Sequence, residues 1–328
     1  MKIQDIFSQF ASKRIAILGD VMMDAYVIGS VTRISPEAPV PIVSLSKKEN
    51  RLGGAANVAL NIVSLGAEAI ICSVVGDDIE GEELIQIFDK ENVNSSGIVR
   101  SKHRKTTVKT RIIGNNQQLL RVDSEQIDPI STDEENQLIQ KVADLIQTRI
   151  DALIFEDYNK GVLTERVITA VLTLCKKANI PTTVDPKRDN FFAYKGVTLF
   201  KPNLKELKEG LNVHFDIANK EAFENAVLQL EEKLQNENTF ITLSEHGVFI
   251  KSAVEKIYIP AHIRTIADVS GAGDTVISVA TLCLAIGLPI EKVAAYANLA
   301  GGLVCEKSGV VSIEKDQLIE EIQIIEKN

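Results

Sequence analysis

The chain has little of what nucleic-acid-binding, secreted or membrane proteins need. It carries 36 Lys and Arg against 45 Asp and Glu, a formal net charge of −9, so it lacks the basic face that nucleic acid or an anionic membrane requires. No apolar run reaches the length that spans a bilayer, and residues 1–14 lack the apolar core of a signal peptide. We therefore expect a cytoplasmic enzyme or binding protein with a small-molecule ligand.

Residues and motifs that mark metal centres and dinucleotide sites are also scarce. The chain has four cysteines and four histidines. The cysteines are far apart, lie in apolar surroundings and form no C-x-x-C pair, which favours reduced thiols. The histidines have no metal-ligand spacing, which argues against a zinc site. Neither G-x-G-x-x-G nor G-x-x-x-x-G-K-[ST] occurs, which argues against a nucleotide-dependent oxidoreductase.

The length and patterning fit one large α/β domain. The 328 residues are 45% hydrophobic, which is ample for a core. Strand-length and helix-length patterns alternate after residue 123, as in parallel sheets with helices on both faces. We expect strands at 14–19, 69–75, 151–155, 181–184, 197–200 and 239–243, and a hairpin at 248–259. We expect helices after the glycine pair at 53–54 and at 81–91, 132–148, 164–178, 220–235, 271–285, 290–304 and 313–325.

Two segments predict a small β lid outside this pattern. The segment 26–46 contains Pro36, Pro39 and Pro41, and proline at that density cannot lie in a central strand. The segment 97–122 alternates in strand fashion, with a hairpin signal at 114–116. We expect both insertions to form one sheet. Exposed edge strands invite pairing, so we also expect a homodimer through the lid.

The stretch 268–275 opens a long apolar helix and predicts an anion site. Gly271 and Gly273 let backbone N–H groups approach a ligand, and a helix start leaves such groups unpaired. Asp274 would repel phosphate as a ligand, but it suits a base that takes a proton from a hydroxyl attacking phosphorus. The alternative is an acid that only satisfies the helix dipole.

Polar residues follow several of the expected strands, where ligands of open α/β sheets gather. Asp20 and Asp24 follow the first strand and are placed to bind hydroxyls, or else to cap a turn. Gly53, Gly54 and Asn57 suit a neutral polyol. Later strand ends carry Glu156, Asp157, Lys160, Asp185, Lys187, Lys201, Asn203 and Glu206. Thr242, Ser244 and Gly247 suit a phosphate-rich ligand, or are ordinary strand and turn residues.

Three motifs in order make the chain resemble the ribokinase-like (PfkB) carbohydrate kinases. They are Gly-Gly-Ala-Ala-Asn at 53–57, Asn-Leu-Lys-Glu at 203–206 and Gly-Ala-Gly-Asp at 271–274. A narrower resemblance is to the kinase domain of the heptose-synthesis enzymes of lipopolysaccharide assembly, which phosphorylate D-glycero-D-manno-heptose 7-phosphate at O1. The segments that carry it are 19–24, 33–41, 116–121 and 157–161.

The resemblance implies a three-layer α/β/α fold with a mostly parallel sheet and a lid, and a kinase that uses ATP and Mg²⁺, with K⁺ as a further candidate ion. Asp274 would be the base, and the N–H groups of Gly271, Ala272 and Gly273 would stabilise the transferred phosphoryl group. Nucleotide residues would be Asn203, Glu206, Thr242, Ser244, Gly247 and Asn298, with Glu206 holding Mg²⁺ indirectly and Asp268 near a monovalent cation. Sugar-binding residues would be Asp20, Asp24, Gly53, Gly54, Asn57, Arg121, Asp157, Lys160 and Lys187.

Some features depart from this family or leave its substrate open. Glu156 stands where a small residue is usual, and Ser270 where threonine is common. No H-x-G-H motif occurs, so we expect a kinase domain over 1–328 without a nucleotidyltransferase. A sugar phosphate needs basic partners, with candidates Arg33, Lys109, Arg111, Arg121, Lys160 and Lys187. The alternatives are a kinase for another sugar, such as fructose or ribose, and a silent sugar-binding regulator.

Overall fold

The computed structural model describes residues 2–262 and 264–327, and its centre is a nine-stranded sheet. The strand order is β13-β12-β11-β10-β9-β8-β1-β4-β5. Seven strands from β5 to β11 are parallel, and β12 and β13 run antiparallel at one edge. The bounds are β1 (Arg14–Gly19), β4 (Glu68–Gly76), β5 (Asn94–Ser101), β8 (Ala152–Glu156), β9 (Thr182–Asp185), β10 (Leu199–Phe200), β11 (Asn238–Thr242), β12 (Val248–Lys251) and β13 (Lys256–Ile259).

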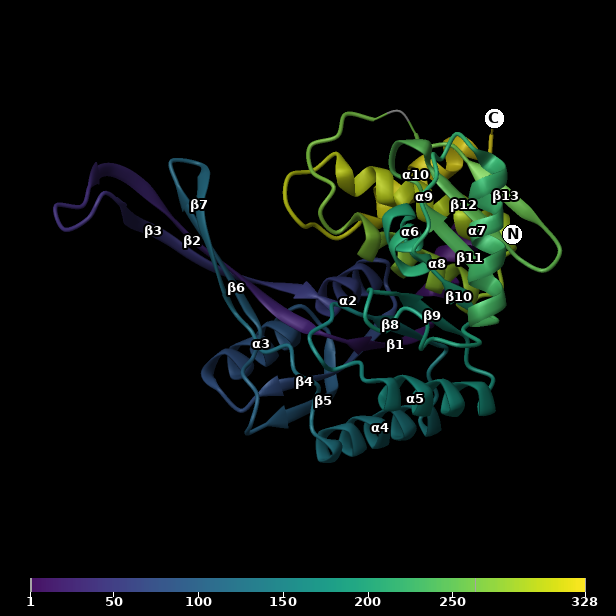
Figure 1. Cartoon of the computed structure of the whole chain (residues 1–328), viewed down its shortest axis with the longest axis horizontal. Helices are drawn as coiled ribbons and strands as arrows, with labels where there is room; N and C mark the ends of the chain where they lie inside the picture. The colour runs from purple at the N-terminus through teal and green to yellow at the C-terminus, as the bar shows by residue number, and fades with distance from the viewer. Residues whose placement is uncertain (1, 263, 328) are drawn as a thin grey trace.

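Helices cover both faces of this sheet, giving three layers (Figure 1). Alternating residues of β1 show why: Ile15 and Ile17 join one core, and Ala16 and Leu18 join the other, as the two-residue period of a strand requires. The first core contains side chains of α1 (Ile3–Phe10), α2 (Ala55–Ser64), α3 (Ile79–Lys90), α8 (Ala272–Ala285), α9 (Ile290–Cys305) and α10 (Lys315–Ile325). The second contains those of α4 (Thr132–Gln147), α5 (Glu165–Lys177), α6 (Leu204–Leu211) and α7 (Lys220–Leu234).

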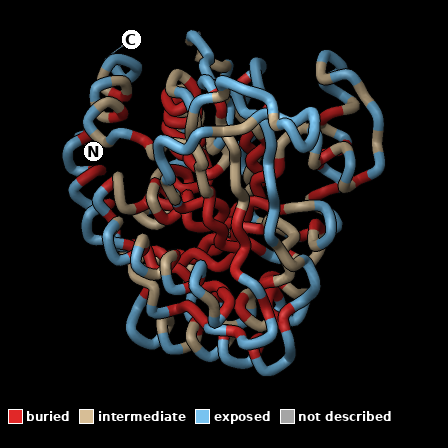
Figure 2. Tube along the Cα trace, turned by 90° about the vertical axis from the view of Figure 1, so that its left-hand side faces the viewer, coloured by how far each residue is buried: buried red, intermediate tan, exposed pale blue. Residues whose placement is uncertain are grey.

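Buried segments gather in the middle of this body, and exposed segments form its outside (Figure 2). All four cysteines are buried and free, as the sequence predicts. None of the helices in the described residues is both long and apolar enough to cross a membrane.

A second, four-stranded sheet projects from the side of the body (Figure 1). Its order is β3-β2-β6-β7, and its strands are β2 (Val21–Ile34), β3 (Pro41–Gly54), β6 (Val108–Gly114) and β7 (Gln117–Ser124). Pro36 and Pro39 lie in the turn between β2 and β3, where no ladder hydrogen bond is lost. We call this second sheet the lid.

The lid differs from the prediction at both insertions. It begins at Val21, directly after β1, and its second strand runs on to Gly54. The predicted strand at 97–99 is not part of it, because these residues lie in β5 and pair with β4 of the main sheet. Ile98 and Val99 are buried, and a Cβ on Gly97 would lie 2.5 Å from the Cys72 sulfur. The alternating pattern of residues 97–99 therefore comes from β5, an edge strand of the main sheet, and not from a strand of the lid.

The structure also contains helix α6, which the sequence pattern does not predict: residues 203–206 fit the end of a strand there, whereas α6 begins at Leu204. Asn203 is its N-cap: the Asn203 side chain accepts from the Glu206 N–H at 2.9 Å, and the Glu206 side chain accepts from the Asn203 N–H at 2.8 Å. This reciprocal capping box explains why a helix begins directly after the two-residue strand β10.

A substitution at Gly19, at the end of β1, tests how tightly β1 packs on β8. A Cβ at this position would lie 2.0 Å from the backbone oxygen of Glu156 on β8. We expect Gly19→Ala to lower the free energy of unfolding by roughly 1–3 kcal/mol, since the strands must move apart. Urea denaturation measures this change.

Gly302→Ala is the matched control. Gly302 lies within α9, and a Cβ there would lie 3.3 Å from the Arg264 side chain, which would need to shift by only a few tenths of an ångström. Alanine stabilises a helix interior by roughly 0.5–1 kcal/mol over glycine, so this variant should be neutral or more stable. Equal stability of the Gly19→Ala variant and the wild type would contradict the tight packing of β1 on β8.

Candidate active site

Asp274 lies in the first turn of α8, where that helix meets the carboxyl ends of the central strands. Its side chain is buried and accepts two hydrogen bonds. Asn57, from the first turn of α2, donates its Nδ2 to Oδ2 at 2.6 Å. Tyr158, just beyond β8, donates its hydroxyl to Oδ1 at 3.0 Å. Both bonds hold the carboxylate in one orientation.

The start of α8 supplies backbone donors beside this carboxylate. Gly271 is the N-cap residue with φ of 80°, a left-handed conformation that favours glycine. Ala272 and Gly273 form the first turn. The Ala272 N–H donates to the Val269 backbone oxygen at 3.3 Å, and the Gly273 N–H has no partner within the helix. A Cβ on Gly271 would lie 3.0 Å from the Asn57 amide nitrogen, so this glycine serves both the turn and the close approach of α8 to α2.

Burial raises the pKa of Asp274 from its ordinary value of 3.8 to about 6. The nearby Asp185 carboxylate also raises it, while the hydrogen bonds from Asn57 and Tyr158 and the charge of Lys201 lower it. The result is a carboxylate that is ionised near neutral pH and still basic enough to accept a proton, as a general base requires.

Two lysines connect the ends of β9 and β10 to the start of α6. Lys201 donates to Asp185 at 2.8 Å, and both groups are buried. Lys187 contacts Glu206 at 2.9 Å and lies 3.6 Å from the other Asp185 oxygen. The sequence singled out Lys187 and Glu206 for separate ligands, and the structure brings them together.

A cavity of about 960 Å³ opens beside this cluster. It is bounded by the first turns of α6 and α8 and by the end of β11. Seven of the predicted site residues line it: Lys187, Asn203, Glu206, Thr242, Ser244, Gly273 and Asp274, together with Asp185 and Lys201. Its size and its amide, hydroxyl and lysine lining fit a phosphorylated ligand.

Two predicted nucleotide residues are not in the lining of this cavity. Gly247 has φ of 87°, and a Cβ there would lie 2.0 Å from the Ile259 backbone oxygen. Asn298 donates to the Pro260 backbone oxygen at 2.9 Å. The structure thus gives each a local structural role, and contact with nucleotide stays a prediction for both.

Asp24 and the glycine pair lie at the base of the lid, just before helix α2, whose Asn57 contacts Asp274. Asp24 on β2 forms an ion pair with Arg111 on β6. A Cβ on Gly53 would lie 2.5 Å from the Asp24 carboxylate, and one on Gly54 would lie 2.4 Å from the Asp20 backbone oxygen. Close packing within the lid therefore requires Gly53, and the approach of β3 to the residue that follows β1 requires Gly54.

Asp20 holds the loop that carries Tyr158. Its carboxylate is buried and accepts from the N–H groups of Tyr158, Lys160 and Val162 at 2.9–3.1 Å. Burial raises the pKa of Asp20. The predicted substrate residue therefore acts on the site through Tyr158, a residue that the sequence did not single out.

The remaining predicted sugar residues have partners elsewhere. The Asp157 carboxylate accepts from Tyr194 at 2.7 Å and Asn190 at 3.1 Å, and Lys160 forms an ion pair with Glu125. Arg121 pairs with Asp123 within β7 of the lid. None of these three side chains contacts Asp274 in the described structure, so their contact with substrate stays a prediction.

Asp268 holds the loop that precedes α8. It accepts from the N–H groups of Ser270 at 2.9 Å and Gly309 at 3.1 Å, and these bonds lower its pKa. A monovalent cation near this carboxylate also stays a prediction.

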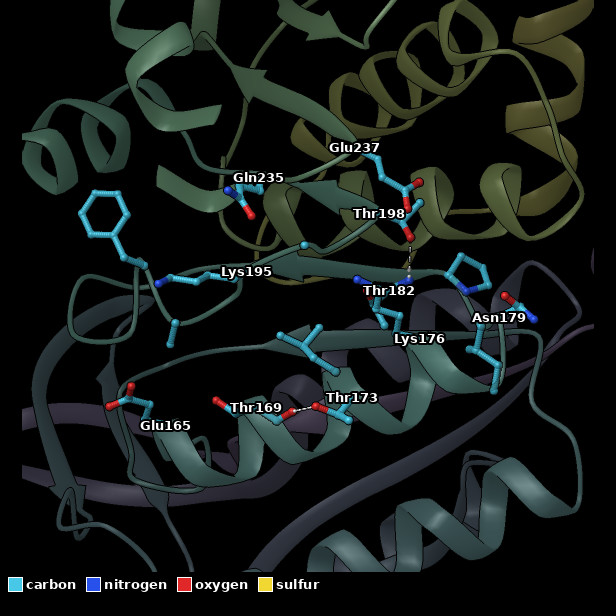
Figure 3. A pocket seen from close by; sticks show the side chains of 16 residues that line it. Glu165, Thr169, Thr173, Lys176, Asn179, Thr182, Lys195, Thr198, Gln235 and Glu237 are labelled. Carbon is cyan, nitrogen blue, oxygen red and sulfur yellow. Dashed lines mark hydrogen bonds between the residues drawn. The ribbon is translucent and has the colours of Figure 1, made fainter. Parts of the chain in front are cut away.

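A second cavity, of about 870 Å³, lies at the other end of the strands (Figure 3). Its labelled side chains come from α5, from Asn179 just after it, from the amino ends of β9 and β10 with Lys195 before β10, and from the segment between α7 and β11. Asp185 ends β9 at its carboxyl side, so this cavity is separate from the Asp274 site. None of the predicted site residues lines it.

The fold and site define a phosphoryl-transfer enzyme that acts on a hydroxyl, and comparison with known proteins identifies the family. The model for the pfkB family carbohydrate kinases matches residues 12–316. The chain belongs to this family, as predicted, and is a sugar kinase.

Curated relatives align with this chain over nearly its whole length. Bifunctional protein HldE of Helicobacter pylori (strain G27) is 39% identical over 309 residues, which cover 94% of this chain and 66% of that protein. Bifunctional protein HldE of Pelobacter propionicus is 37% identical over 98% of this chain and 66% of that protein. The chain thus spans slightly less than two thirds of these relatives.

Solved structures confirm the predicted fold. Phosphofructokinase-2 from Escherichia coli in complex with potassium superposes with a TM-score of 0.78 at 19% identity, covering 96% of this chain and 99% of that one. Arabidopsis thaliana ribokinase complexed with ribose and ATP gives 0.70 at 16% identity, covering 94% and 98%.

The burial of Asp274 predicts a stability cost that depends on pH. Because its folded pKa lies above its ordinary value, wild-type stability falls as pH rises from about 4 through about 6. Asp274→Asn stays neutral and escapes this loss. The free energy of unfolding of the variant, relative to that of the wild type, should rise by about 3 kcal/mol between pH 4 and pH 8. Urea denaturation of both proteins at both pH values measures this, and a difference that does not change with pH would contradict it.

Proposed function

We propose that this kinase phosphorylates O1 of D-glycero-D-manno-heptose 7-phosphate with ATP, giving heptose 1,7-bisphosphate. The observation that carries the proposal is the position of Asp274 between the nucleotide-sized cavity and the base of the lid. The segment 33–41 and the HldE relatives at 37–39% identity support the heptose substrate over other sugars.

The proposed reaction is a direct transfer. Asp274 takes the proton from the O1 hydroxyl, an O1–phosphorus bond forms, and the bond between the γ-phosphorus and the bridging oxygen of ADP breaks. The N–H groups of Ala272 and Gly273 stabilise the charge on the transferred group. Asn57 and Tyr158 keep Asp274 aimed at the hydroxyl.

The cavity beside α6 is the proposed ATP site. Thr242 and Ser244 line it near the end of β11, and Lys187 and Lys201 supply positive charge for phosphates. A Mg²⁺ ion that accompanies ATP neutralises phosphate charge during transfer. Glu206 fits an indirect, water-mediated contact to this ion, because its two carboxylate oxygens already accept from Asn203 and Lys187.

The sugar would bind between Asp274 and the polar face of the lid. The side chains of Asp24 and Arg111 lie on this face, with Lys109 two residues before Arg111 on the same strand. Arg111 already pairs with Asp24, so the substrate 7-phosphate would draw on Lys109 or on residues further along the lid, such as Arg33 and Arg121.

A panel of sugars with Mg-ATP tests the substrate. We expect heptose 7-phosphate to be turned over in preference to fructose, ribose and unphosphorylated heptose, because the lid offers basic groups for a phosphate. Release of ADP measures turnover. A preference for unphosphorylated sugars would contradict the heptose proposal, and no ADP release with any sugar would indicate a silent regulator.

Asp274→Asn tests the base in the same assay. The rate should fall by roughly 10²–10⁴-fold, the usual contribution of a general base. The amide keeps the shape of the site, so Mg-ATP binding should remain. Undiminished turnover of this variant would exclude Asp274 as the base.

We also propose a homodimer through the lid, whose two faces differ in character. Successive strand residues point to opposite faces, and the pairing register places Val31, Leu45, Leu120 and Val122 on one face of the lid. Leu45, Leu120 and Val122 are half exposed or more. Asp24 and Arg111 lie on the other face. An uncovered apolar face this far from the body suits the same face of a second copy.

Light scattering at micromolar concentration tests the dimer. We expect a dimer for the wild type and a shift towards monomer for Leu120→Asp, which places a charge on the apolar face. Ser30→Asp is the control, because Ser30 is exposed on the opposite face. A monomeric wild type would rule out this assembly.

A further inference from the structure

Lys160, in the loop after β8, has a partner at each of its polar groups. Its backbone N–H donates to the Asp20 carboxylate at 3.1 Å, and its backbone oxygen accepts from the Arg104 guanidinium. Its ammonium group donates to Glu125 at 2.8 Å, and its side chain is only 16% exposed. Both the backbone and the side chain of Lys160 are therefore fixed, unlike those of an ordinary surface lysine.

These three partners lie where the lid joins the body. Asp20 directly precedes β2, Glu125 directly follows β7, and Arg104 lies in the segment that leads from β5 to β6. Arg104 also donates to the backbone oxygens of Gln126 at 2.8 Å and Asp128 at 2.9 Å, just beyond β7. The inner ends of three lid strands, β2, β6 and β7, are thus connected to one residue.

The loop that contains Lys160 also carries Tyr158, whose hydroxyl donates to Asp274 at 3.0 Å. Close packing prevents this loop from moving alone. Gly161 has φ of 85°, and a Cβ there would lie 2.1 Å from the backbone oxygen of Asp128, just beyond the last lid strand. A displacement of the lid strands at their base therefore also displaces Tyr158 relative to Asp274.

The same contacts make Lys160 a poor ligand for a substrate phosphate, for which its charge alone makes it a candidate. A phosphate would have to take the ammonium group from Glu125. The second carboxylate oxygen of Glu125 is buried and has no hydrogen-bond partner in the described part of the chain. Removing the lysine from this carboxylate would leave a largely buried charge uncompensated, which is costly.

We propose that Lys160 is a positioning residue that links the lid strands, through Tyr158, to the Asp274 carboxylate, and that it is not a ligand of the substrate phosphate. The inference rests on the proposed role of Asp274 as the base. The position of the lid and the orientation of the base then change together. Since the Tyr158 hydrogen bond lowers the pKa of Asp274, breaking the link raises that pKa.

Lys160→Met tests the link, because it removes the ammonium group and keeps the length of the side chain. With the sugar that is turned over fastest, kcat should fall by roughly tenfold or more, since small displacements of a catalytic group are costly. KM for the sugar should stay the same. The acid limb of kcat/KM should move to higher pH by about one pH unit, which corresponds to one hydrogen bond to a charged group. Adding Lys160→Met to Tyr158→Phe should move this limb no further.

Glu125→Gln separates the two roles of Lys160 without removing the lysine. If the two residues are a positioning pair, Glu125→Gln moves the acid limb in the same direction as Lys160→Met. If Lys160 binds phosphate, the freed lysine binds it more tightly, so Glu125→Gln lowers KM for a phosphorylated sugar and Lys160→Met raises it. These opposite changes in KM, with the acid limb unmoved in both variants, would overturn the inference.

Lys251→Met is the matched control, because Lys251 and Glu231 form a similarly buried ion pair. Lys251 is on β12, five strands away from β1 in the main sheet, so its loss should leave kcat and the acid limb unchanged. A shift of the acid limb can be assigned to the Tyr158 contact, because the charged groups that face Asp274 are present in every variant. These groups are Glu156, Asp185 and Lys201.

A measurement without turnover decides the inference even if no sugar is phosphorylated. Urea denaturation at pH 4 and pH 8 gives the stability gained by adding Asp274→Asn to Lys160→Met, or to Glu125→Gln if Lys160→Met does not fold. This gain should grow more between the two pH values than it does in the wild-type background, because the pKa of Asp274 is higher. Equal growth in both backgrounds would overturn the inference. Larger growth without phosphorylation of any sugar would support it and overturn only the proposed function.

Discussion

The packing of the α8 N-terminus against the carboxyl ends of β8 and β9 controls the chemistry of this molecule. It buries Asp274, and burial gives that carboxylate the raised pKa of a base. It also places the N–H groups of Ala272 and Gly273 next to Lys201 and the nucleotide-sized cavity. The glycines of this stretch permit the approach, and Asn57 and Tyr158 fix the orientation. The proposed base, the proposed backbone donors and the cavity therefore all depend on one helix contact.

Much of this arrangement could be predicted from the sequence because it depends on local signals. The alternation of strand and helix patterns predicted the parallel sheet, and Gly271 to Asp274 predicted an anion site with an acid beside it. Asn203 and Glu206 were found by their motif. Their mutual hydrogen bonds show why the spacing matters, since the partners of a capping box must lie three positions apart.

Other features depend on pairings that no local pattern contains. The alternation at 97–99 fits a lid strand and a main-sheet edge equally well, and only its pairing with β4 decides between them. The meeting of Glu156 with Asp185 follows from the register of β8 on β9. Tyr158 was missed because its role depends on the loop that Asp20 holds. The sequence did mark Glu156 as unusual for its family, but could not show that it is buried beside Asp185.

The pH dependence of kcat/KM tests the central claim, that burial makes Asp274 the base, most directly. The account predicts that kcat/KM falls tenfold per pH unit below about 6, because protonated Asp274 cannot accept the sugar proton. In Tyr158→Phe this acid limb should move to higher pH, since the hydroxyl that lowers the pKa of Asp274 is gone. A flat profile down to pH 5, or an acid limb that Tyr158→Phe leaves in place, would contradict it.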